Sequence, residues 1–98
     1  MSSEGDPPVS VEELVKQLKV ADLLLGTMAS LVQVGYAKLG DGDTAGARLA
    51  IEALRALTPV LEDAASAEAL RDLRQATSNL QLAYAERVAK PEQPAEET

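Results

Sequence analysis

The longest charge-free segment of the chain lies between Asp22 and Lys38. Its residues are apolar or small at nearly every position, and Gln33 is the main exception. A helix that is apolar on all sides is usually buried on all sides. The pattern therefore predicts a central helix with two amphipathic helices packed against it.

Apolar residues before and within this segment recur in alternating steps of three and four, which is the spacing of a heptad seam. The seam is formed by Leu18, Ala21, Leu25, Met28, Val32, Gly35 and Leu39. Ser10 and Glu13 have the spacing of a capping box, which marks the start of a helix. We therefore expect the first helix to span about 10–39, and Gly40 to end it in the left-handed backbone region.

A second helix is expected at about 44–62, with Asp43 or Thr44 as its N-cap. Its apolar side consists of Ala47, Ala50, Ile51, Leu54, Leu57 and Leu61. Pro59 interrupts this segment, because proline lacks a backbone N–H and clashes with the preceding turn. The apolar side continues across Pro59, which favours one kinked helix. The alternative is a separate short helix that Thr58 caps.

A third helix is expected at about 66–90, where Ser66 caps it and Pro91 stops it. Its seam consists of Leu70, Leu73, Thr77, Leu80, Tyr84 and Val88. Because the turns between the predicted helices are short, consecutive helices should be antiparallel. The expected fold is all-α, an antiparallel three-helix bundle with a long apolar first helix.

This bundle is expected to form a single domain at 10–90. The segments 1–9 and 91–98 contain proline, acidic and small residues, and we expect both to be disordered tails. The core is thin, because the chain has no Phe and no Trp. A thin core in a short chain favours self-association, which buries further apolar surface.

The first predicted helix is longer than the second, so its N-terminal part should overhang the bundle. Leu14 and Leu18 in this overhang have no expected partner within the chain. We therefore expect a homo-oligomer, with a dimer favoured, or a complex with another protein. The expected interface consists of Leu14, Leu18, Ala21, Leu25, Met28 and Val32.

A helical bundle that holds a small apolar ligand between its helices is the alternative function. Small residues and methionine line adaptable apolar pockets. The candidate pocket residues are Gly26, Met28, Ser30 and Tyr36. An interface and a pocket thus draw on the same central helix, and the sequence leaves both open.

The residue types disfavour catalysis. The chain has no His and no Cys, so it lacks an imidazole base, a thiol nucleophile and the usual ligands of a structural zinc site. Its carboxylates are scattered over polar faces and tails, outside the charge-free segment. We expect a protein that is not an enzyme and that has no metal and no cofactor.

The formal net charge is -7, and phosphate backbones repel such a polyanion, so nucleic-acid binding is not expected. The sequence shows no basic region followed by an apolar region, the pattern of a secretion signal. The charge-free segment, at about 15 residues, is shorter than the ~20 residues that span a bilayer. We expect a cytoplasmic protein without a membrane span.

Three segments have a recognisable sequence: Tyr36-Ala-Lys-Leu-Gly40, then Ala47-Arg48 with Ile51, Leu54 and Leu57, and finally Leu80-Gln-Leu-Ala-Tyr84. Together they make residues 22–88 similar to a short all-helical bacterial family of unknown function. The chain departs from that family at Gln81, where arginine is common, and at 63–66, where the family has a Gly-Asn turn. The resemblance implies a bacterial cytoplasmic helical protein and assigns no activity.

Overall fold

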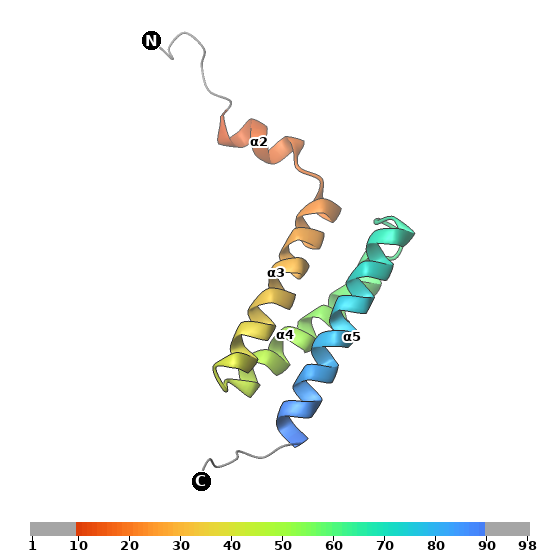
Figure 1. Ribbon diagram of the computed structural model, residues 1–98. Helices are drawn as coiled ribbons and strands as arrows, with labels where there is room; N and C mark the ends of the chain where they lie inside the picture. Colours follow the sequence, from red (N-terminus) through yellow and green to blue (C-terminus); the bar gives the residue numbers. More distant parts are fainter. Residues whose placement is uncertain (1–9, 90–98) are drawn as a thin grey trace.

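A computed structural model describes residues 10–89 of the chain, and this part is all-α, as the sequence pattern predicts (Figure 1). The expected tails at 1–9 and 91–98 lie outside the described residues. The elements in chain order are α2 (Val11–Gln17), α3 (Val20–Gly40), α4 (Thr44–Leu57), the 3₁₀ turn η1 (Thr58–Leu61) and α5 (Ala67–Ala89). The described part thus contains four α-helices where three were expected.

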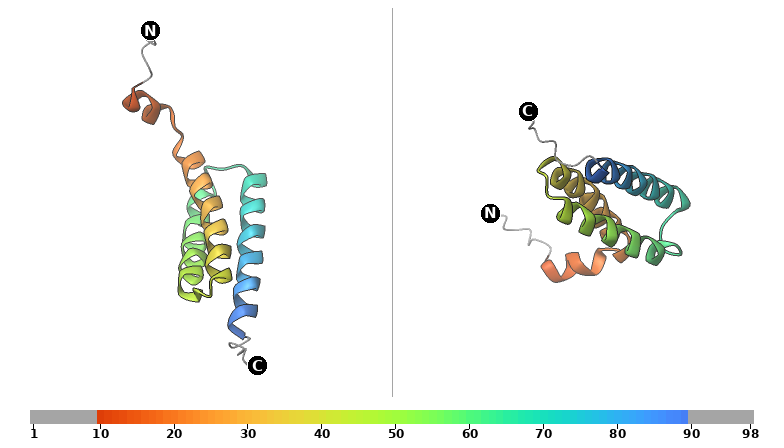
Figure 2. Two further views of the ribbon diagram at one scale, coloured as in Figure 1. Left: turned by 60° about the vertical axis from the view of Figure 1, so that its left-hand side comes forward. Right: turned by 90° about the horizontal axis from the view of Figure 1, so that it is seen from below.

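Helices α3, α4 and α5 pack against one another, and consecutive members of this group run in opposite directions (Figure 2). Their core is built from Leu, Ile, Met and Ala side chains, mostly at the positions of the predicted seams. The core residues are Met28, Leu39, Ala47, Ile51, Leu54, Leu61, Leu70, Leu73 and Leu80. Helix α2 lies apart from this core and buries none of its residues.

The expectation of one continuous helix at 10–39 is wrong, because the helix breaks between α2 and α3. Leu18 and Lys19 are extended, with ψ of 139° and 129°. Helices of a few turns draw most of their stability from packing and little from propensity. Since α2 has no buried residue, the chain supplies no packing that would hold it in line with α3.

The expected kinked helix around Pro59 is also corrected. Helix α4 ends at Leu57, and η1 follows it directly with Pro59 in its first turn. Proline has no N–H to donate, so the α-helical ladder stops and a tighter 3₁₀ turn continues the path. The buried Thr58 hydroxyl donates to the Leu54 carbonyl over 2.6 Å and so adds a side-chain bond at this transition.

The turn between α3 and α4 uses Gly42, and not Gly40, as its left-handed residue. Gly42 has a φ of 83°, which glycine adopts without the strain that a Cβ brings. The Asp43 N–H donates to the Lys38 carbonyl over 2.8 Å, the bond that closes a Schellman turn. Asp43 then caps α4, because its Oδ1 accepts from the Gly46 N–H over 2.8 Å.

Two predicted serine caps are confirmed. The Ser10 Oγ accepts from the Glu13 N–H over 3.1 Å at the start of α2. The Ser66 Oγ accepts from the Ala69 N–H, also over 3.1 Å, at the start of α5. Local sequence therefore sets the start of both helices, although only α5 is then held by a core.

Two glycines of α3 have opposite surroundings. A Cβ on Gly35 would lie 2.7 Å from the Leu80 Cδ2 and 3.4 Å from the Ala50 Cβ, so this glycine lets α3 lie close to α4 and α5. A Cβ on Gly26 would meet no atom within 4 Å. Gly35 is therefore required by the core, whereas Gly26 faces open space.

Candidate functional site

One exposed face of α3 carries no charge along most of its length. We call it the outer face of α3, and it consists of Leu23, Gly26, Thr27, Ser30, Val34 and Ala37. Leu23 is 55% exposed and Val34 is 47% exposed. The nearest charges on the helix are Asp22 and Lys38, which lie at its two ends. Solvent therefore meets an apolar and small-residue surface over about four helical turns.

The exposed faces of the other two packed helices are different, because they carry ionic groups. Arg48 and Glu52 pair over 3.1 Å along α4. Arg74 of α5 reaches Glu62 beyond η1 over 2.6 Å. Exposed ion pairs of this kind add little stability, but they are typical of surfaces that remain in contact with water. The outer face of α3 has no such ion pair.

Helix α2 carries a second exposed apolar surface. Its apolar residues and the leucine that directly follows it stand at the spacing i, i+3, i+4 and i+7, which places them along one side of the helix. We call them the α2 stripe, which consists of Val11, Leu14 and Val15 of α2 and Leu18 at its C-cap. Each of these side chains is between 50% and 75% exposed. The stripe therefore has no core to cover within the described chain.

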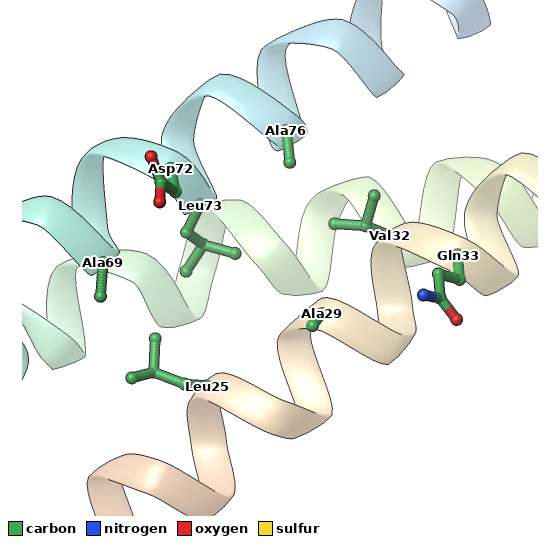
Figure 3. Close-up of a pocket in the computed structure, with 8 residues that line it drawn as sticks. All are labelled: Leu25, Ala29, Val32, Gln33, Ala69, Asp72, Leu73 and Ala76. Carbon is green, nitrogen blue, oxygen red and sulfur yellow. The ribbon is translucent and has the colours of Figure 1, made fainter.

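An apolar groove runs between α3 and α5 (Figure 3). We call it the α3–α5 groove, and it has a volume of about 390 Å³. Its lining residues are Leu25, Ala29, Val32, Gln33, Ala69, Asp72, Leu73 and Ala76. Only Gln33 and Asp72 are polar, and in Figure 3 their end groups point away from the space between the helices. The groove thus offers apolar walls with small alanine side chains.

The residues expected at an interface are divided among three places. Leu14 lies exposed on α2, and Leu18 lies exposed at the C-cap of α2. Met28 is fully buried in the core, so its side chain does not reach the surface. The partly buried residues that pack on the core include the other three, Ala21, Leu25 and Val32. Leu25 and Val32 also line the α3–α5 groove.

The structure does not bring the four expected pocket residues together. Gly26 and Ser30 line a shallow hollow on the outer face of α3, whereas Met28 lies in the core. Tyr36 lies near the C-terminal end of α3, beside Arg87. Residues two apart on a helix differ by about 200° in direction, which separates Met28 from both small residues. The α3–α5 groove contains none of the four residues.

Sequence reasoning missed the role of Arg87. Its Nη1 donates to the Leu39 carbonyl over 2.7 Å, so a side chain of α5 satisfies the last turn of α3. A cation near the C-terminus of a helix is a favourable arrangement. This contact could not be predicted from the sequence, because it depends on the C-terminal ends of α3 and α5 lying at the same end of the molecule (Figure 2).

Within residues 10–89, no group of three or more His, Cys, Asp or Glu side chains is placed to hold a metal ion. In the same range, α3 is the one helix long and apolar enough to cross a membrane by length and composition alone. Core helices of soluble proteins meet the same criterion. Here α3 buries Met28, Gly35 and Leu39, but only 11% of its apolar segment is buried, so most of this segment is exposed or partly exposed.

Comparison with protein-family models, with curated proteins and with solved structures gives no match to this chain. Its function is therefore inferred from its own residues. Three surfaces carry that inference: the outer face of α3, the α2 stripe and the α3–α5 groove.

Proposed function

We propose that the chain is a non-catalytic protein-interaction module that self-associates, with a dimer as the favoured state. In this proposal α3, α4 and α5 form an antiparallel three-helix bundle, and α2 extends from it. Exposed apolar residues of α2 and α3 form the interface. The observation that carries the proposal is the outer face of α3, which is exposed and yet has no charge between Asp22 and Lys38.

The apolar part of this face gains free energy when a partner covers it. Full burial of a Leu or Val side chain stabilises by roughly 1.5–3 kcal/mol. Leu23 and Val34 are about half exposed, so each retains about half of that gain for an interface. Gly26 and Ser30 are small, and they let a partner helix approach closely.

Charge favours the same face as the contact between two copies. A chain with a net charge of -7 repels a second copy over most of its surface. A two-fold dimer places the same patch on both sides of its interface, so a patch with a net negative charge would face a second negative patch. The outer face of α3 avoids this repulsion because it is uncharged.

The proposal is tested by Leu23→Glu, with Leu49→Glu as the matched control. Leu49 is 67% exposed on α4, so both changes add one carboxylate at an exposed leucine of a helix. Sedimentation equilibrium is expected to show a dimer for the wild type and Leu49→Glu, and a monomer for Leu23→Glu. Circular dichroism is expected to show equal helix content. A folded Leu23→Glu protein that dimerises like the wild type would contradict the proposal.

The proposed module is cytoplasmic and bacterial, binds no nucleic acid and does not span a membrane. The net negative charge supports the absence of nucleic acid. Helices α4 and α5 pack on α3 and carry exposed ion pairs on their outer surfaces. These ion pairs support the absence of a membrane span, because a bilayer interior rejects charged side chains. The bacterial origin rests on the resemblance of residues 22–88 alone.

A second candidate function is binding of a small apolar ligand in the α3–α5 groove. It is favoured by the groove volume of about 390 Å³, which falls within the range of ligand pockets. Titration with the fluorescent probe anilinonaphthalene sulfonate tests it. This function predicts that the wild type binds one probe per chain at saturation and that Ala29→Arg abolishes this binding. Weak probe binding without saturation would contradict the candidate function.

A further inference from the structure

We propose that α2 of one copy docks in the α3–α5 groove of a second copy, so that the dimer exchanges its N-terminal helices. This inference rests on the proposed self-association, and it adds to the outer face of α3 a second contact that the dimer also needs. Its basis is an apolar helix without a core and an apolar groove without a covering helix.

The α2 stripe has the form of a helix that binds in a groove. Such helices present anchors at i, i+3, i+4 and i+7 to a hydrophobic cleft. Val11, Leu14, Val15 and Leu18 have this spacing, and all four are at least half exposed. Helix α2 is short and its own core contacts are absent, so docking would supply the packing that stabilises it.

The α3–α5 groove matches α2 in length. Helix α2 has seven residues, which corresponds to about 10 Å at 1.5 Å per residue. The groove extends along α3 from Leu25 to Gln33, about 12 Å, and along α5 from Ala69 to Ala76, about 10 Å. Ala29 stands between the two ends and leaves room for a third helix to approach. One α2 helix therefore covers the groove along its length.

The link between α2 and α3 favours a second copy as the source of the docked helix. Docking of α2 in the groove of its own chain requires the backbone to reverse direction at Leu18 and Lys19. Both residues are extended, and they carry α2 away from α3, α4 and α5 (Figure 1). Exchange of an identical element is a low-cost route to a two-fold dimer, and it forms two equivalent contacts.

The natural absence of cysteine allows a direct test with two single-cysteine proteins. Leu14→Cys labels α2, and Ala29→Cys labels the groove. The two proteins are mixed in equal amounts and oxidised, and any disulfide between the two labels joins two chains. We expect this mixed product, identified by mass, to form at least tenfold faster than the product of Leu14→Cys with Leu49→Cys, which lies outside the groove. Equal rates would overturn the exchange.

Leu14→Glu separates failure of the exchange from failure of self-association. Leu14 is exposed on α2, so this change leaves the core intact, and it avoids Leu18, which borders the hollow on the outer face of α3. The exchange predicts a folded monomer in sedimentation equilibrium. A Leu14→Glu dimer would overturn the exchange and leave the outer face of α3 as the interface. A monomeric wild type would overturn both proposals. In that case, an intrachain disulfide in the double variant Leu14→Cys with Ala29→Cys would show that the chain's own α2 occupies the groove.

Discussion

The two glycines of α3 allow the packing of the core to be tested with one chemical change at two positions. Gly35→Ala and Gly26→Ala each add a single methyl group to the same helix. At Gly35 that methyl lies 2.7 Å from the Leu80 Cδ2, whereas at Gly26 it meets nothing within 4 Å. Leu80 is fully buried, so its side chain has no route into solvent. The two variants should therefore change stability in opposite directions.

The expected magnitudes follow from two opposing effects. Replacing glycine by alanine inside a helix stabilises by roughly 0.5–1 kcal/mol, and both variants receive this gain. Overpacking of a close-packed core costs about 1–3 kcal/mol, and only Gly35→Ala meets this cost. We expect Gly26→Ala to stabilise the fold by roughly 0.5–1 kcal/mol and Gly35→Ala to destabilise it by about 1 kcal/mol.

Urea denaturation followed by circular dichroism measures both values. Gly26 lies on the proposed interface, so the titration is made at the lowest usable protein concentration, where dissociation limits the contribution of the dimer. Equal m-values would show that the unfolded states are comparable. A Gly35→Ala protein as stable as Gly26→Ala would refute the close approach of α3 to α5 at Leu80.

The remaining predictions concern the turn and the contact at the C-terminal end of α3. Gly42→Ala places a Cβ in the left-handed region and should lower the free energy of unfolding by about 1–2 kcal/mol. Gly40→Ala is the same change at a helical position with open space, and it should raise the free energy of unfolding by roughly 0.5–1 kcal/mol. Equal urea midpoints for the two variants would rule out the left-handed turn at Gly42. Arg87→Met removes the donor to the Leu39 carbonyl and should lower the midpoint by an amount equivalent to about 1 kcal/mol. An unchanged midpoint would show that water replaces the guanidinium there.

The helices of the core could be predicted from the sequence, because heptad spacing reports directly which residues share a face. Leu70, Leu73 and Leu80 follow that spacing in α5, and all three are buried. The cap at Ser66 could be predicted for a similar reason, since it depends on the next few residues alone. Where local chemistry decides the structure, the sequence pattern is sufficient.

The break at Leu18 and Lys19 could not be predicted, because neither residue is a helix breaker and the apolar spacing continues across them. Tertiary packing decides this point, and α2 lacks it. Gly40 was expected at the left-handed position, and this was wrong because Gly42 fits the end of a helix as well. Only the length of α3 in the folded chain assigns the left-handed position to Gly42.

The sequence predicts the composition of the candidate surfaces, but it does not predict which side of the helix is exposed. The charge-free segment of α3 is plain in the sequence, but an uncharged helix does not show which of its sides meets α4 and α5. Met28 was therefore expected at an interface, although it lies in the core. The α3–α5 groove was missed because its alanines come from two helices far apart in the chain.

Sedimentation equilibrium of the wild-type protein over a wide range of concentration tests the central claim most directly. Self-association through the exposed apolar surfaces of α2 and α3 predicts a folded dimer that dissociates only at low concentration. A folded protein that stays monomeric at every concentration would contradict the claim.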